Sequence, residues 1–235
     1  MENYKKIVEF IFLMFILVSC ADKINKPKEK QLEEKNYVSK TNLAMSKLSK
    51  LFVVGNFDGE GKIDTLFQHT FSKKTNAEII LAPNPFKNDW EEVEKWFYNQ
   101  DAEITLSFNE TKKEVLHLGI AQGLYCLINV GDINRDGKDE VAFVVDFLDQ
   151  SRVNNCKIYS YCYNKWELVK QFGVLEDAFD FDSKVNKSPI FNEIKEYLEK
   201  KNGIWLYKDY NENEYDNPED VGRLLPLKVE KCDAD

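Results

Sequence analysis

Several chemistries that the sequence lacks limit its function before any motif is considered. The chain has only two histidines, His69 and His117, and both lie in strand-like apolar surroundings where a structural role is expected. No Walker loop, HExxH motif, nucleophile elbow, zinc-ligand spacing or CxxC pair is present. The sequence therefore offers no motif for phosphoryl transfer, for zinc or serine hydrolysis, or for dithiol redox chemistry.

A surplus of basic residues is also missing. The formal net charge is −9, and residues 21–50 are net positive, so residues 51–235 are more acidic than the whole chain. Binding to a nucleic acid backbone requires a surplus of Lys and Arg. We therefore expect no nucleic acid partner, whereas an acidic domain suits calcium or a basic partner.

The apolar run Ile7–Val18, of about 12 residues, is shorter than the roughly 20 that a spanning helix needs. It leads into Leu-Val-Ser-Cys at residues 17–20, which resembles a bacterial lipobox. The resemblance implies that residues 1–19 are a signal peptide and that Cys20 is acylated, for example with palmitate, and anchors the chain to a membrane. An ordinary secretory signal followed by a coincidental cysteine is the alternative, and the chain is exported in both cases.

Residues 20–50 follow as a flexible tether, because Lys, Glu, Asn, Gln and Ser cannot bury enough apolar surface to fold. Surface-export signals of the Bacteroidota are acidic directly after the acylated cysteine. Residues 21–26 contain one acid and two lysines. For a host of that group we therefore expect the periplasmic face of the envelope.

Residues 51–235 predict a single domain of mainly antiparallel β structure, because short aromatic or β-branched runs alternate with Gly, Asn and Asp. Residues 109–113 and 164–165 have the size of hairpin turns. Acidic loops are expected at residues 175–187 and 211–220. The predicted strands are residues 50–54, 63–68, 78–81, 103–108, 114–118, 124–130, 140–147, 157–163, 166–172, 203–207 and 224–229.

Two segments have helical rather than strand periodicity. Residues 89–100 follow a capping residue, and a second run opens at Ser188-Pro189 and ends at Asn202-Gly203. Both predict amphipathic helices whose apolar stripes face the core, although a ligand platform is the alternative. The stripes are Trp90, Val93, Trp96 and Phe97 in the first helix, and Ile190, Phe191, Ile194, Tyr197 and Leu198 in the second.

The most informative stretch is residues 130–141, where a polar loop lies between two apolar, strand-like runs. Asp132, Asn134 and Asp136 alternate, so three oxygen donors fall on one side of a tight turn, and Gly137 lets the chain reverse. Calcium takes about six to eight oxygen ligands from carboxylates, amides and backbone carbonyls. We expect a calcium site whose ligands are side chains of Asp132, Asn134, Asp136 and Glu140 and the carbonyl of Lys138.

The same pattern occurs once before, because Gly55–Asp64 aligns with Gly131–Glu140 at an offset of 76 residues. Residues 56–64 are called the first loop and residues 132–140 the second loop. Lower charge and the longer reach of Glu60 predict that the first loop binds calcium more weakly. Its corresponding ligands are Asn56, Asp58, Glu60, the carbonyl of Lys62, and Asp64.

A strand, the sequence Gly-Asp-x-Asn-x-Asp-Gly-x-x-Glu and a following strand resemble the FG-GAP and VCBS-type repeats of integrin α-subunits and secreted bacterial proteins. The resemblance covers the two loops and the strands beside them, and it implies the two ligand sets given above. In that family the loops join strands of a β-propeller blade. A propeller usually takes four or more blades, so we expect a compact or degenerate propeller-like β domain.

Other loop families and a metal-free loop are the alternatives. An EF-hand is disfavoured because Phe143 stands where a bidentate Glu belongs and because strands flank the loop, and a dockerin fails for the same reason. Each loop is alternatively a polar hairpin built from Asx turns without metal. If calcium binds, the commoner role of such an ion is to fix the geometry of the loop without any further function.

Apart from Cys20, the exported chain has four cysteines, which permits two disulfides whose connectivity is open. Cys156 and Cys162 would be roughly 20 Å apart on one extended strand, so we do not expect them to pair with each other unless the chain bends. Cys126 shares a strand face with apolar residues, so a buried free thiol is as acceptable at this position as a disulfide. The remaining cysteine is Cys232.

The leading hypothesis is a lipid-anchored, calcium-stabilised and non-enzymatic binding or interaction domain of the cell envelope, with a protein or glycan partner. A specific variant is an immunity lipoprotein, which the acidic charge motivates. The rival is an envelope enzyme that acts on glycans through acidic residues such as Asp180 and Asp182. A deep cleft with converging carboxylates away from the loops would favour the rival.

Overall fold

The computed structural model describes residues 42–109, 113–179, 191–210 and 222–232. Outside this part lie the expected signal peptide at residues 1–19, Cys20, Asp180, Asp182 and Pro189. No described helix is long and apolar enough to cross a membrane. The elements are β1 (Met45–Lys47), β2 (Phe52–Gly55), β3 (Asp64–Ser72), β4 (Ala77–Glu78), β5 (Leu81–Pro83), α2 (Trp90–Gln100), β6 (Ala102–Phe108), β7 (Leu116–Ile120), β8 (Gly123–Gly131), β9 (Glu140–Asp146), β10 (Val153–Cys162), β11 (Lys165–Leu175), η1 (Glu176–Phe179), β12 (Leu198–Lys201), β13 (Ile204–Tyr207) and β14 (Leu225–Pro226).

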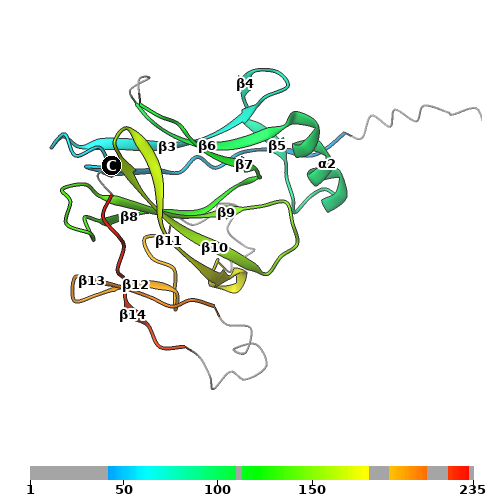
Figure 1. Cartoon of the computed structure of the whole chain (residues 1–235). Helices are drawn as coiled ribbons and strands as arrows, with labels where there is room; N and C mark the ends of the chain where they lie inside the picture. Colours follow the sequence, from blue (N-terminus) through cyan, green and yellow to red (C-terminus); the bar gives the residue numbers. More distant parts are fainter. Residues whose placement is uncertain (1–41, 110–112, 180–190, 211–221, 233–235) are drawn as a thin grey trace, which may run out of the picture. The chain divides into compact units, whose positions relative to one another are not determined.

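The strands pair antiparallel and form sheets that pack face to face. The central sheet has the order β11-β10-β9-β8, and the sheet β2-β3-β6-β7, with β4 attached to β3, covers one of its faces (Figure 1). The sheet β12-β13-β14 packs on the other face. The described strands form neither a closed barrel nor a propeller, so the prediction of mainly antiparallel β structure is confirmed without any propeller-like closure.

β9 is the centre of this arrangement because both of its faces are covered. Every residue from Glu140 to Val145 is buried, as expected for a strand whose sequence is an almost continuous apolar run. Ala142 and Val144 belong to the core shared with β12–β14, whereas Val141, Phe143 and Val145 belong to the core shared with β3 and β6. The strand that leaves the second loop is therefore covered on both of its faces.

The folded unit begins at Asn42 rather than near residue 51. β1 pairs with β5, and Leu48 packs on a small core with Val93 and Phe97. The end of the predicted tether is thus part of the domain. A short apolar and polar mixture such as Met45–Lys47 gives little strand signal by itself, because its pairing partner supplies the stabilisation.

One of the two predicted helices is present. α2 buries Val93 and Phe97 and ends at Asp101 in a left-handed conformation, with φ 48°. The second prediction is wrong, because Leu198–Lys201 is a strand that forms a hairpin with β13. Asn202 and Gly203 have φ values of 52° and 80°, which is the two-residue hairpin turn that Asn-Gly favours. This dipeptide was the signal for a hairpin, not for a helix end.

Candidate metal centre

The first and second loops occupy equivalent places in two neighbouring hairpins. The first loop joins β2 to β3, and Gly55 pairs with Asp64 at its base. The second loop joins β8 to β9, and Gly131 pairs with Glu140 at its base. The alignment at an offset of 76 residues therefore relates positions with the same role in the fold.

The two loops share two of their internal hydrogen bonds. The Gly61 N–H donates to Asn56 Oδ1 at 3.1 Å, and the Gly137 N–H donates to Asp132 Oδ2 at 3.0 Å. Such bonds fold the first side chain of each loop back over the turn. The next pair agrees as well, with Glu60 N–H to Asp58 Oδ1 at 2.8 Å and Asp136 N–H to Asn134 Oδ1 at 2.9 Å.

The backbone repeats too, including the left-handed positions that both turns require. Gly59 and Arg135 correspond and have φ values of 78° and 61°, and Gly61 and Gly137 correspond and have values of 74° and 92°. A non-glycine residue such as Arg135 rarely adopts this conformation. Arg135 nevertheless has this left-handed conformation in the second loop, which indicates that the hydrogen bonds around it determine the turn.

The second loop gathers three carboxylates around one point. Oxygens of Asp132, Asp136 and Glu140 lie within 4.8 Å of one another. Glu140 is fully buried, and its oxygens accept hydrogen bonds from Ile133 N–H at 2.8 Å and from the Ser160 hydroxyl at 3.3 Å. Burial, reinforced by the charges of the other two acids, raises the pKa of Glu140 to about 7.

No described lysine or arginine forms an ion pair with these three acids. The Lys138 ammonium points away and donates to the Tyr161 carbonyl at 3.0 Å. Lys231 Nζ approaches the Arg135 carbonyl at 3.3 Å. Glu140 is buried, Asp136 is partly buried and Asp132 is exposed. A buried carboxylate needs compensating charge or hydrogen bonds, and oxygen ligands of this kind suit Ca²⁺.

Asn134 is held at the edge of the carboxylate cluster. Its Oδ1 faces the loop backbone, and its Nδ2 donates to Asp136 Oδ2 at 3.2 Å and to the Glu230 carbonyl at 3.3 Å. Five of the expected groups thus come from one loop, namely Asp132, Asn134, Asp136, the Lys138 carbonyl and Glu140, and the structure brings the three acids among them together.

The first loop has a different arrangement. The Lys113 ammonium contacts Asp58 Oδ2 directly and lies 3.6 Å from Asp64 Oδ1. Glu60 and Lys62 are exposed, so the acids of this loop do not gather into a cluster of three in the described part of the chain. Sequence reasoning missed Lys113, because it comes from the β6–β7 connection and nothing in the loop pattern indicates it.

Lys113 changes the ionisation of the two aspartates. Burial alone raises the pKa of Asp58, but hydrogen bonds from Lys113 and from the Glu60 N–H outweigh it and lower the pKa. Burial and the neighbouring Asp58 charge raise the pKa of Asp64, which Lys113 offsets only in part. The first loop therefore already contains a cation, supplied by the chain.

The two loops are bonded to each other. The Asn56 N–H donates to Asp139 Oδ2 and the Asp139 N–H donates to the Asn56 carbonyl, both at 2.9 Å. Asn129 Nδ2 bridges the same carboxylate and the Val54 carbonyl at 2.9 and 3.0 Å. A short polar network therefore connects the two loops.

A disulfide holds the C-terminal segment over the second loop. Cys162 at the end of β10 pairs with Cys232, and Cys232 Sγ lies 3.5 Å from Asp136 Oδ2. Because this sulfur is in a disulfide, the approach is a contact and not a hydrogen bond. Cys126 and Cys156 are buried thiols on either side of Val144, so the buried-thiol alternative holds for Cys126 and the expected absence of a Cys156–Cys162 bridge is confirmed.

The histidines are not in apolar surroundings. His69 and His117 lie on the outer face of the β2-β3-β6-β7 sheet, where they line an open groove of about 430 Å³ with side chains 38% and 62% exposed. Each contacts a glutamate, His69 with Glu78 at 2.9 Å and His117 with Glu103 at 3.1 Å. The expectation of an apolar setting was wrong because outward strand positions alternate with core positions.

Comparison of the chain with protein-family models, with curated proteins and with solved structures finds no significant match. The candidate metal centre therefore stands on its own geometry.

Proposed function

We propose that the chain is a lipid-anchored, non-enzymatic interaction domain of the bacterial envelope whose second loop binds calcium, with an envelope protein or glycan as partner. The observation that carries the calcium site is the fully buried Glu140 in a cluster with Asp132 and Asp136, without a described basic side chain to neutralise them. The repeated loop conformation and its resemblance to FG-GAP and VCBS-type loops support the same assignment.

The acylation of Cys20 and the periplasmic location rest on the lipobox resemblance and on the residues after it. Changing Cys20 to Ala should release the protein from the membrane fraction, because the acyl chain has no other attachment point in this reading. Continued partition of that variant into detergent would contradict the anchor. Protease treatment of intact cells distinguishes the periplasmic face from the cell surface.

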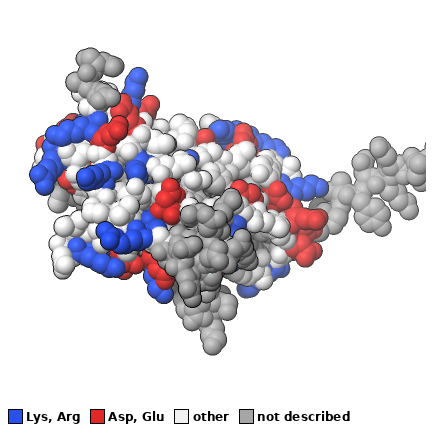
Figure 2. Space-filling model, turned by 60° about the horizontal axis from the view of Figure 1, so that its bottom comes forward, with Lys and Arg blue, Asp and Glu red and all other residues white. Residues whose placement is uncertain are grey.

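The hypothesis of an immunity lipoprotein would be favoured by a patch of acidic side chains, and no such concentrated patch lies on the described part of the face that Figure 2 shows. Figure 2 shows basic and acidic side chains interspersed over the described part of that face. Five of the acidic residues lie in the range 211–220, outside the described residues. The general binding role therefore remains the proposal, and capture of partners from the native envelope is its test.

The rival enzyme requires two carboxylates free to act as acid and base. In the open groove, Glu78 is paired with Lys50 and His69, and Glu103 is paired with Lys73 and His117. The Lys50 hydrogen bond lowers the pKa of Glu78 despite its partial burial. A carboxylate held in this way is a poor general acid, so the groove favours binding over hydrolysis.

Calcium binding is tested by thermal unfolding of the unmodified protein in calcium and in chelator. A ligand that binds only the folded state stabilises it by RT ln(1 + [Ca²⁺]/Kd), about 2.7 kcal/mol at a hundredfold excess over Kd. Extracellular-type sites bind at about 10⁻⁴ to 10⁻³ M, so millimolar calcium is required. Magnesium is the control, because its strict octahedral demand makes it a poor substitute.

Asp136→Asn should abolish most of the calcium-induced rise in melting temperature. Glu60→Gln is the matched control in the first loop and should leave the rise unchanged, because Glu60 is exposed and away from the cluster. Equal melting temperatures of the unmodified protein in calcium and in chelator would overturn the proposed site.

A further inference from the structure

We propose that the Lys113 ammonium is the built-in cation of the first loop, so that the folded chain binds one calcium ion and not two. The proposal rests in part on the calcium site of the second loop. It assigns Lys113 as the residue that determines which of two similar loops takes metal.

The position of the ammonium is the first support. Lys113 Nζ contacts Asp58 Oδ2 and lies 3.6 Å from Asp64 Oδ1. Asp58 and Asp64 correspond to Asn134 and Glu140, which belong to the expected ligand set of the second loop. The ammonium therefore occupies the side of the first loop at which a calcium ion would meet the same two ligand positions.

The burial of the three charged groups is the second support. Only 12% of the Lys113 side chain is exposed, and the side chains of Asp58 and Asp64 are 5% and 14% exposed. Solvent screening is weak in such a place, so the ammonium would strongly repel a calcium ion placed beside it. Calcium could enter only by displacing the ammonium.

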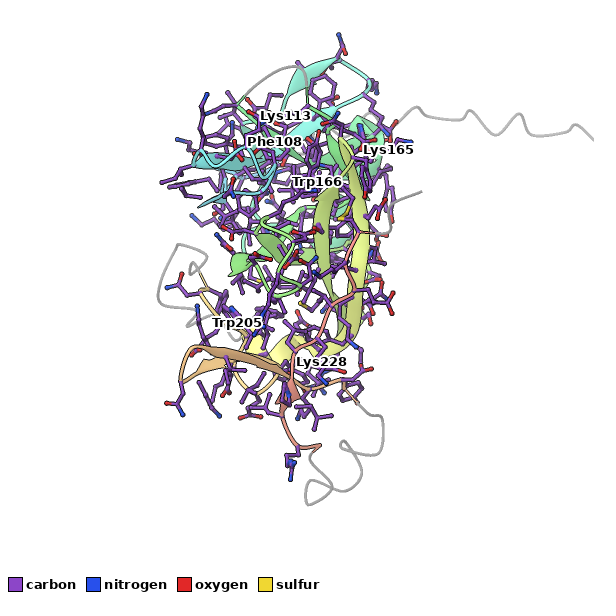
Figure 3. All side chains as sticks on the ribbon, turned by 60° about the vertical axis from the view of Figure 1, so that its left-hand side comes forward. Phe108, Lys113, Lys165, Trp166, Trp205 and Lys228 are labelled. Atoms are coloured by element: carbon purple, nitrogen blue, oxygen red, sulfur yellow. A yellow bond between two sulfur atoms is a disulfide. The ribbon has the colours of Figure 1, made fainter. Side chains whose placement is uncertain are left out.

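The rest of the Lys113 surroundings oppose displacement. Nζ lies 4.9 Å from the centre of the Phe108 ring, and Phe108 stacks on Trp166 at 5.4 Å. Figure 3 shows Lys113 beside Phe108, with Trp166 close to both. An aromatic face attracts an ammonium, so two carboxylates and one ring together hold Lys113 over the first loop.

The contrast with the second loop is the third support. There the covering segment contributes the disulfide sulfur of Cys232 and the carbonyl of Glu230, and no described ammonium reaches the acids. Two loops with matching hydrogen bonds thus differ in their cation. One has a lysine from the β6–β7 connection, and the other has three acids that no described basic side chain pairs with.

The test counts calcium ions bound per chain by equilibrium dialysis of the full-length protein in detergent at millimolar calcium. The unmodified chain and Asp58→Asn should both bind one ion, since the first loop does not use metal. Lys113→Ala removes the ammonium and leaves space, so it should bind two. Lys113→Arg keeps the charge and should bind one, as should Lys165→Ala, a control at an exposed lysine.

Two results would overturn the proposal: an unmodified chain that binds two ions and loses one in Asp58→Asn, or a folded Lys113→Ala chain that still binds one. Should Lys113→Ala fold poorly in chelator, the Asp58→Asn result decides alone. An unmodified chain that binds no calcium contradicts the proposed function instead, and a gain from none to one in Lys113→Ala would then still support the role of Lys113.

Discussion

The two loops have similar backbone conformations but differ in what lies beside their carboxylates. In the first loop, Asp58 and Asp64 meet an ammonium from a distant segment, whereas in the second loop Asp132, Asp136 and Glu140 meet no described basic side chain. Backbone hydrogen bonds define the turn, and the residue that lies over the turn defines the cation. A loop motif therefore predicts a shape more securely than it predicts a metal.

The largest expected effect concerns the segment that covers the second loop. Changing Cys162 and Cys232 to Ser removes a cross-link across a sequence separation of 70 residues, which should cost about 4 kcal/mol of unfolding free energy in the chain-entropy model. Because Cys232 contacts Asp136, the variant should also bind calcium more weakly. Denaturant unfolding in calcium and in chelator measures both.

A covering role for the disulfide predicts that the loss exceeds the chain-entropy value in calcium and approaches it in chelator. The same loss in both solutions would mean that the disulfide stabilises the fold without influencing the second loop.

The next effect separates the two ends of β9. Asp146 lies outside the loops, and burial raises its pKa to about 6 despite hydrogen bonds from Gln122 and Tyr125. The folded state therefore binds a proton more tightly than the unfolded state, so this contribution to stability is complete below pH 3.8 and is lost as pH rises through 6. The change is at most about 3 kcal/mol, reduced because Asp146 is partly exposed.

Asp146→Asn should remove this pH dependence in calcium and in chelator alike, as followed by melting temperature between pH 4 and pH 7. If calcium abolished the effect of Asp146→Asn, the two ends of β9 would not be independent and the restriction of calcium to the second loop would be contradicted.

The smallest effects are expected from Gly55 and Gly131, which stand at equivalent positions at the bases of the two loops. A side chain is opposed at these two positions by different physical causes. A Cβ on Gly55 would lie 2.4 Å from Asn129 Nδ2 and 2.7 Å from Asp139 Oδ2, whereas Gly131 has φ +78° and open space around it. Gly55→Ala should cost about 1–3 kcal/mol through overpacking. Gly131→Ala should cost about 1–2 kcal/mol through backbone strain.

Asn distinguishes these causes, because it adopts the left-handed conformation more readily than Ala but is larger. Gly131→Asn should therefore be more stable than Gly131→Ala, while Gly55→Asn should be less stable than Gly55→Ala. The same order at both positions in denaturant unfolding would show that one cause acts at both.

Local features such as strands and turns were predicted from the sequence more successfully than the packing of distant segments. Each predicted strand overlaps an observed one, and the loop alignment holds down to individual hydrogen bonds, because turn residues and alternation act over a few neighbours. The helix expected after Pro189 failed because spacing alone cannot separate a helix stripe from the Leu198–Lys201 strand, and the turn residues Asn202-Gly203 were decisive.

The parts that the sequence could not provide are contacts between distant segments. Lys113 lies 55 residues from Asp58, and Cys232 lies 96 residues from Asp136. No local pattern encodes either contact, because each depends on how whole sheets pack. The difference in what covers the two loops therefore depends on the fold, although the loops themselves can be recognised in the sequence.

The most direct test of the central claim is the effect of Glu140→Gln on thermal stability, measured in chelator and in calcium at pH 8. Gln relieves a buried charge that no described basic side chain neutralises, so in chelator the variant should be more stable, by about 3 kcal/mol from the raised pKa of about 7. In saturating calcium it should be the less stable protein, because a ligand is lost. A variant that is less stable by the same amount in both solutions would contradict the account, since Glu140 would then be an ordinary structural residue of the hairpin.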